Sequence, residues 1–195
     1  MLRIAIFISG RGTNMQAITK EVNGGVLKGL CQIALVFSNK CDAAGLTFAR
    51  QEGLPVACIE SAGKKRTEFD KQVIELLQPY SVDYIVLAGY MRILSPQFIR
   101  AYPNRIINIH PADTRLHQGL HAYQWAFANQ LSQTAITIHY VNEGVDTGQI
   151  IAQQTVDLTG ATTLEAVEQR GLQAEYQLYS QTLANLFLSE LNKKQ

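Results

Sequence analysis

The sequence has few cysteines, and no two of them are at the spacing of a metal site. Cys31, Cys41 and Cys58 are odd in number and form no C-x-x-C pattern. His117 and His121 are one helical turn apart but belong to no H-E-x-x-H motif. We therefore expect neither a disulfide framework nor a metal site, as is typical of a cytoplasmic protein.

The sequence also has no large excess of charge of one sign and no long apolar run. The 17 Lys and Arg residues nearly balance the 16 Asp and Glu residues, so no surface for binding nucleic acid is predicted. No apolar run approaches the ~20 residues that span a bilayer. The apolar stretch at residues 4–8 is too short for the core of a signal peptide. We expect no nucleic-acid or membrane partner, and one domain over residues 1–195.

Short apolar segments alternate with segments of helical periodicity. The expected strands are residues 3–9, 33–37, 56–59, 84–88, 106–109 and 135–141, and the expected helices are residues 14–22, 43–52, 66–77 and 120–129. The first, fourth and fifth strands are apolar almost throughout, as in parallel sheets that helices cover on both faces. Residues 134–158 are rich in β segments, and a long last helix follows at residues 163–191. The pattern predicts an α/β fold with a doubly wound, mostly parallel sheet and a ligand site at the carboxyl ends of its strands.

Residues 9–14, with the sequence Ser-Gly-Arg-Gly-Thr-Asn, follow the first expected strand and open a helix. Small residues at this place let backbone N–H groups approach an anion such as phosphate. Met15 replaces the third glycine of the dinucleotide fingerprint and the P-loop lysine is missing, so neither NAD nor ATP binding is indicated. The alternative is a tight turn in which Thr13 or Asn14 caps the helix.

Asn108 and His110 end the fifth expected strand, just before Pro111. Alternate residues of a strand share a face, so this amide and this imidazole can reach one reacting atom. A polar turn with Asn108 as its cap is the alternative. Asp146 lies in the glycine-containing loop 143–148, which by itself is explained as a turn. Close to His110, however, its carboxylate would raise the imidazole pKa and keep that ring cationic.

Residues 89–96 follow the fourth expected strand and contain mainly apolar side chains with one arginine. Ser95 and Pro96 have the pattern of a helix N-cap and first helical position. A loop of this kind at the carboxyl end of a strand can form the wall of a site for a planar ligand. Packing of its apolar side chains in the core is the alternative.

Five segments, taken in order, resemble the folate-dependent formyltransferases. They are residues 8–14, 36–40, 87–96, 108–111 and 145–148. The phosphate loop and the lack of an added domain favour the branch of this family that formylates glycinamide ribonucleotide in purine synthesis. The resemblance implies a Rossmann-like fold and 10-formyltetrahydrofolate as the formyl donor, without a metal. The alternatives are a sugar amine or water as formyl acceptor, or a nucleotide-binding regulatory module without turnover.

The resemblance also implies roles for individual residues. Asn108, protonated His110 and Asp146 match the catalytic residues of the family. The residues that match its contacts to the nucleotide are Gly12, Thr13, Asn14 and Glu175, and those that match its contacts to the folate are Arg66, Met91, Arg92, Ile93, Leu94 and Asn108. We expect small-molecule partners and either a monomer or a homodimer.

Three places depart from the pattern of this family. Residues 112–115 are Ala-Asp-Thr-Arg where the family usually has Ser-Leu-Leu-Pro. Tyr176 stands where it has histidine, and Gln149 stands where it often has proline. Asp113 and Arg115 bring charge close to the expected acceptor amine, and we expect them to pair with each other at a solvated rim.

Overall fold

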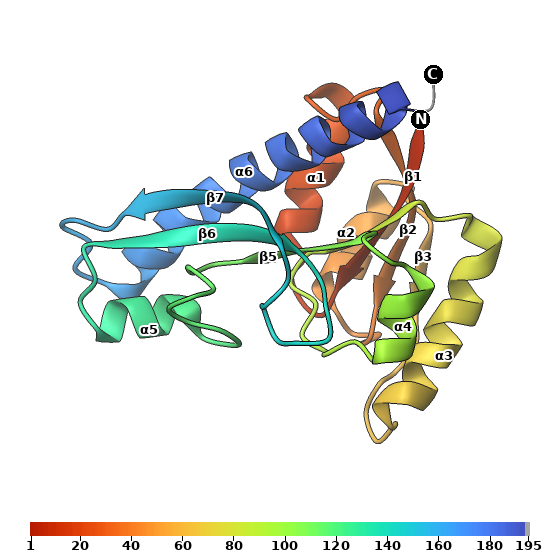
Figure 1. Cartoon of the computed structure of the whole chain (residues 1–195), viewed down its shortest axis with the longest axis horizontal. Coiled ribbons are helices and arrows are strands. Elements are labelled where there is room, and N and C mark those ends of the chain that lie inside the picture. The colour runs from red at the N-terminus through yellow and green to blue at the C-terminus, as the bar shows by residue number, and fades with distance from the viewer. Residues whose placement is uncertain (194–195) are drawn as a thin grey trace.

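The computed structural model describes residues 1–193, which are organised around one seven-stranded sheet (Figure 1). The strands are β1 (Leu2–Ile8), β2 (Cys31–Ser38), β3 (Val56–Cys58), β4 (Tyr84–Leu87), β5 (Ile106–His110), β6 (Gln133–Tyr140) and β7 (Ile150–Asp157). Their order across the sheet is β3-β2-β1-β4-β5-β6-β7. The first five strands pair in parallel, while β6 and β7 are antiparallel to their neighbours. The predicted mostly parallel sheet and β-rich C-terminal part are confirmed.

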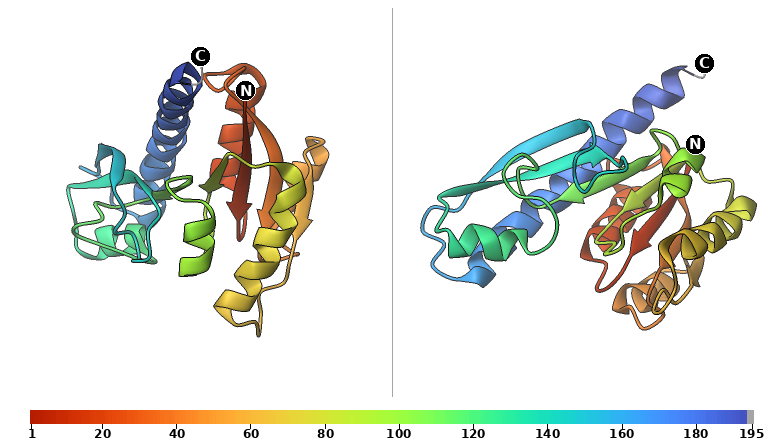
Figure 2. Two further views of the ribbon diagram at one scale, coloured as in Figure 1. Left: turned by 45° about the vertical axis from the view of Figure 1, so that its right-hand side comes forward. Right: turned by 60° about the horizontal axis from the view of Figure 1, so that its bottom comes forward.

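Helices cover both faces of this sheet (Figure 2). One face carries α1 (Thr13–Gly24), α2 (Ala44–Gln51), α5 (Ala122–Ala128) and α6 (Leu164–Lys193), and the other carries α3 (Arg66–Leu77) and α4 (Pro96–Ala101). A short 3-10 turn, Gln78–Tyr80, follows α3. The expected long last helix is α6, which packs along β6 and β7 and reaches α1 (Figure 1). No helix within residues 1–193 is long and apolar enough to cross a membrane.

The alternation of side chains along β1 explains why helices are needed on both sides. Ile4, Ile6 and Ile8 are buried against α1 and α6, whereas Ala5 and Phe7 are buried against α3 and α4. Burying a side chain the size of isoleucine contributes roughly 1.5–3 kcal/mol, so a strand apolar on both faces is stable only at the centre of the sheet. The carboxyl ends of β1, β4 and β5 are thereby fixed side by side.

Two helix boundaries follow from single residues. α5 begins at Ala122, after the expected start at residue 120, because His121 has a positive φ of 65°. Ser95 accepts a hydrogen bond from the Phe98 N–H at 3.3 Å, and Pro96 is the first residue of α4. The predicted cap is therefore confirmed, although residues 96–101 were not among the expected helices.

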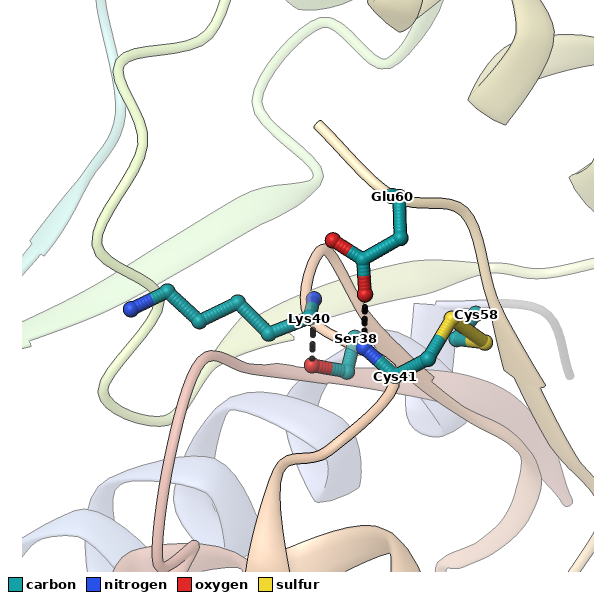
Figure 3. The surroundings of a disulfide bond; sticks show 5 residues. All are labelled: Ser38, Lys40, Cys41, Cys58 and Glu60. Atoms are coloured by element: carbon teal, nitrogen blue, oxygen red, sulfur yellow. Dashed lines mark hydrogen bonds between the residues drawn. A yellow bond between two sulfur atoms is a disulfide. The ribbon is translucent and has the colours of Figure 1, made fainter. Parts of the chain in front are cut away.

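The expectation of no disulfide is wrong. Cys41 and Cys58 are joined by a disulfide, with their Cα atoms 5.4 Å apart (Figure 3). β2 and β3 are parallel neighbours and Ser38 pairs with Cys58, so the loop after β2 passes over the end of β3. The Cys41 N–H also donates to Glu60 at 2.5 Å. Pairing between strands brings these cysteines together, and no rule on cysteine spacing along the chain detects that.

Reducing this disulfide is expected to lower the free energy of unfolding by about 3 kcal/mol, because it releases a short closed loop in the unfolded chain. The two cysteines are 17 residues apart. Urea unfolding with and without a dithiol reductant measures the effect. The double variant Cys41→Ser, Cys58→Ser should match the reduced protein and show no response to reductant. Equal midpoints for the oxidised and reduced wild type would contradict this expectation.

Candidate active site

A cavity of about 410 Å³ opens at the carboxyl ends of β4 and β5. This volume suits a small organic ligand, and the position is the one at which doubly wound sheets bind ligands. The loop after β4 forms its apolar wall. Its polar wall contains Asn108, His110, His139 and Asp146.

Asp146 is the centre of the polar wall. Its Oδ2 lies 3.3 Å from Nδ1 of His110 and accepts a hydrogen bond from the Gly119 N–H at 2.8 Å. Its Oδ1 accepts a hydrogen bond from Asn108 Nδ2 at 3.3 Å and lies 3.4 Å from Nε2 of His139. The loop between β6 and β7 thus carries this carboxylate back to the end of β5. The structure brings together the three side chains singled out as catalytic candidates.

His139 is a member of this cluster that sequence reasoning missed. It lies on β6 directly opposite Asn108, and its side chain is buried. Its Nδ1 lies 2.9 Å from the Tyr140 carbonyl oxygen. Its Nε2 lies 3.2 Å from Asn108 Nδ2 and 3.4 Å from Asp146 Oδ1. The sequence contains one signal for His139, which is a polar ring among the apolar residues of the expected strand 135–141. Its pairing with Asn108 required the antiparallel register.

Both ring nitrogens of His110 face hydrogen-bond acceptors. Nδ1 faces Asp146, and Nε2 lies 3.0 Å from the His117 carbonyl oxygen. Burial lowers the pKa of His110 below its ordinary value, although Asp146 and the His117 carbonyl act in the raising direction. The expected influence of the carboxylate is present, but the expected net rise is wrong, because burial penalises the cation more strongly.

The carboxyl group of Asp146 shows the opposite balance. Burial acts to raise its pKa, but hydrogen bonds from His139 and Gly119, together with the charge of His110, hold it below the ordinary value. Asp146 is therefore an anion at neutral pH. An anion so close to His110 favours the imidazolium whenever the reaction places a proton there.

Residues 9–14 form the turn from β1 into α1. Gly12 is the N-cap residue, with a φ of 70° in the left-handed region that glycine adopts easily, and no side chain caps the helix. The alternative in which Thr13 or Asn14 is the cap is therefore wrong. The first N–H groups of a helix have no partner within it, so the start of α1 offers donors to an anion.

Ser9 joins this turn to the apolar wall of the cavity. Its hydroxyl donates to Asn39 Oδ1 at 2.5 Å and accepts from the Met91 N–H at 2.8 Å. The Ser9 N–H donates to the Gly89 carbonyl at 3.0 Å. The phosphate-loop candidate and the cavity are therefore neighbouring parts of one edge of the sheet.

Asn14 and Glu175 meet although they are far apart in the sequence. Asn14 Nδ2 donates to Glu175 Oε2 at 2.6 Å, and Tyr123 donates its hydroxyl to Oε1. Burial raises the pKa of Glu175, against these two hydrogen bonds, which lower it. Asn14 Oδ1 is buried and has no hydrogen-bond partner among the described residues. A carboxylate and an amide oxygen thus form a set of acceptors suited to hydroxyl groups.

The four candidates in the loop after β4 all line the cavity. These residues are Met91, Arg92, Ile93 and Leu94. Met91 is 63% exposed and Ile93 is 52% exposed, so packing in the core explains only Leu94, which is buried. When a ligand covers exposed apolar side chains on a cavity wall, their removal from water favours binding.

Three charged candidates lie outside this cavity. Arg66 is exposed at the start of α3 and is not among the residues that line the cavity. Arg115 Nη2 lies 2.6 Å from Asp113 Oδ2, so the expected pairing of these two residues is confirmed. Both line a separate hollow beside Trp125, and the charged segment therefore does not replace the wall next to His110.

Comparison with known proteins gives consistent matches over nearly the whole chain. The formyl transferase family matches residues 2–183. The chain is 40% identical to a phosphoribosylglycinamide formyltransferase of Haemophilus influenzae over 92% of this chain and 84% of that protein. It is 36% identical to the trifunctional purine biosynthetic protein adenosine-3 of Homo sapiens over 93% of this chain, but only 18% of that protein.

A solved structure gives the same result. Glycinamide ribonucleotide transformylase 1 from Symbiobacterium toebii superposes with a TM-score of 0.91 at 37% identity, covering 97% of this chain and 89% of that chain. The shared fold therefore includes the edge of the sheet where Asn108, His110 and Asp146 meet. On the family match and these relatives, the chain belongs to the formyl transferase family.

Proposed function

We propose that this protein transfers the formyl group of 10-formyltetrahydrofolate to the primary amine of glycinamide ribonucleotide, with residues 1–195 acting as one formyltransferase domain. The observation that carries the proposal is the approach of Asn108 and His110 to one carboxylate, that of Asp146, on the wall of a ligand-sized cavity. The names of the relatives from Haemophilus influenzae and Symbiobacterium toebii support the choice of acceptor.

The two substrates occupy neighbouring places in this proposal. The folate lies in the cavity against the residues that line it, Met91, Arg92, Ile93, Leu94 and Asn108. The nucleotide phosphate lies on the backbone of Gly12, Thr13 and Asn14 at the start of α1, and its ribose lies at Glu175. Arg66, which is exposed at the start of α3, contacts an acidic end of the folate in this proposal.

In the reaction, the substrate amine attacks the formyl carbon and negative charge develops on the formyl oxygen. Asn108 and His110 donate hydrogen bonds to that oxygen, and donors of this kind are most effective when they are held in place beforehand. Asp146 favours the imidazolium at this stage. The bond between the formyl carbon and the folate nitrogen then breaks, and the proton that leaves the amine passes to that nitrogen. Because the amine attacks the formyl carbon directly, no covalent bond to the protein forms.

One contact of His110 has to change in the proposed reaction. Its Nε2 is directed at the His117 carbonyl, and this contact occupies the nitrogen that the formyl oxygen would use. Substrate binding therefore has to displace the His117 carbonyl before His110 can donate to the reacting oxygen.

A panel of acceptors tests the proposed function. The protein is mixed with 10-formyltetrahydrofolate and glycinamide ribonucleotide, an amino sugar nucleotide or no acceptor, and release of tetrahydrofolate is followed. Release only with glycinamide ribonucleotide is expected. Release without an acceptor would identify a hydrolase, and release only with the sugar amine would change the acceptor.

Two glycines of the phosphate loop are expected to respond differently to substitution. A Cβ at Gly12 would lie 3.0 Å from Met15 Cε and 3.3 Å from Gly45 Cα, at a positive φ, so Gly12→Val strains the fold. A Cβ at Gly10 meets nothing within 4 Å. Gly10→Val should therefore weaken nucleotide binding about tenfold or more, by blocking anion approach, while folate binding and melting temperature stay unchanged.

Titration calorimetry with each ligand, together with thermal melting, measures these effects. Gly12→Val should melt earlier and bind both ligands less well. If Gly10→Val bound the nucleotide as tightly as wild type, the phosphate would not approach the turn past Gly10.

A further inference from the structure

We propose that Tyr123 is a positioning residue that holds Glu175 for the vicinal hydroxyl groups of the nucleotide ribose, and that Gly171 provides the space that Tyr123 needs. This inference rests on the proposed function. It assigns a role to two residues that no motif of the sequence singles out.

The contact between α5 and α6 places the Tyr123 phenol directly on the carboxylate. Its hydroxyl donates to Glu175 Oε1, while Asn14 Nδ2 donates to Oε2 at 2.6 Å. Each carboxylate oxygen is thus fixed by one protein donor and retains acceptor capacity for another. Because Glu175 is only 5% exposed, its orientation depends on these two partners and little on solvent.

The unpartnered amide oxygen beside Glu175 indicates what this arrangement binds. Asn14 is 7% exposed, and its Oδ1 has no hydrogen-bond partner among the described residues. Buried acceptors without donors are costly, so a ligand that brings hydroxyl donors is stabilised there. Two neighbouring hydroxyls of a ribose meet this need, whereas a 2′-deoxyribose leaves one acceptor unsatisfied.

Gly171 lies on α6 against the Tyr123 ring. A Cβ built at this position would overlap the Tyr123 Cε1, Cζ and hydroxyl oxygen. Any side chain at Gly171 therefore displaces the phenol from Glu175. Because Gly171 has no side chain, it leaves the space that the Tyr123 phenol occupies when it donates to Glu175.

The test compares Tyr123→Phe with Tyr176→Phe, which removes the same hydroxyl from the residue next to Glu175. A hydrogen bond to a charged group is worth about 1.5–3 kcal/mol, so Tyr123→Phe should raise the KM for the nucleotide about tenfold to about 100-fold. The kcat at saturation and the KM for the folate should stay within about twofold, because the phenol does not touch the reacting atoms. Tyr176→Phe should change none of the three.

The second measurement is the ratio of kcat/KM for the ribonucleotide to kcat/KM for the 2′-deoxyribonucleotide. A purely structural role of Tyr123 would leave this ratio unchanged. Wild type should prefer the ribonucleotide, and Tyr123→Phe should lose most of that preference while it remains folded at the assay temperature. Gly171→Ala should show the same loss and serves as the second variant if Tyr123→Phe is unstable.

The outcomes separate this inference from the proposed function. A wild-type protein without formyl transfer to glycinamide ribonucleotide would refute the proposed function itself. Normal transfer with an unchanged nucleotide KM and unchanged ribose preference in Tyr123→Phe, or in Gly171→Ala if the first variant is unstable, would overturn the role of Tyr123 alone.

Discussion

Replacing His110 or Asn108 by alanine is expected to lower kcat about 100-fold to about 1,000-fold while the affinity for each substrate changes little. Both side chains act on negative charge that develops mainly in the transition state, and loss of one such donor typically lowers kcat by this factor. The loop that carries Asp146 should stay in place in either variant, because the Gly119 N–H still donates to this carboxylate.

Steady-state kinetics of the two variants, with separate binding titrations for folate and nucleotide, measures this effect. Asn185→Ala is the control, since Asn185 is on the surface of α6 and pairs there with Gln181. It should retain wild-type kinetics. Near wild-type turnover in His110→Ala or Asn108→Ala would mean that the assigned mechanism is wrong.

Asp146→Asn is expected to remove most activity, about 100-fold or more, by lowering the pKa of His110 further. Burial already holds that pKa below 6.5, and Asp146 is the main influence that opposes it. Asparagine preserves the size of the side chain and can accept the Gly119 N–H, but it does not stabilise an imidazolium. The fraction of His110 that is protonated at any given pH should therefore be smaller in the variant.

The lowered pKa of His110 in the folded protein also makes the free energy of unfolding depend on pH. Because the folded pKa of His110 lies below the unfolded value, the unfolded chain binds more protons just below pH 6.5. This histidine therefore makes stability fall as the pH drops from 6.5 toward the folded pKa, and Asp146→Asn should extend that fall to lower pH.

NMR titration of the His110 ring in both proteins measures the pKa directly, and the His139 ring should be followed as well because it also faces Asp146. Lost activity with an unchanged His110 pKa would contradict the coupling of charges and assign Asp146 to ordering of its loop.

The sequence predicts well those parts of the molecule that depend on local patterns. β1, β4 and β5 are recognisable because burial on both faces makes them apolar almost throughout, and Ser95-Pro96 marks the start of α4 because capping is local. The position of the cavity follows from the order of strands and helices alone. Asn108 and His110 could therefore be placed at its edge before any contact was known.

Features made by pairing between distant strands and helices could not be predicted in this way. The Cys41–Cys58 disulfide depends on the register of β2 and β3, and His139 joins the site through the antiparallel register of β5 and β6. Tyr123 reaches Glu175 only because α5 packs on α6. The net direction of the His110 pKa shift depends on how deeply the ring is buried, and the spacing of residues does not determine that.

The most direct test of the proposed reaction is a single-turnover experiment with 10-formyltetrahydrofolate labelled with ¹³C in the formyl group. Wild-type protein in excess is mixed with this donor and with glycinamide ribonucleotide, and the label is located by NMR. The proposed function predicts that the label appears on the nucleotide amine, and that Asp146→Asn delays its appearance about 100-fold or more. Label recovered as formate, or label that remains on the folate in the presence of folded wild-type protein, would contradict it.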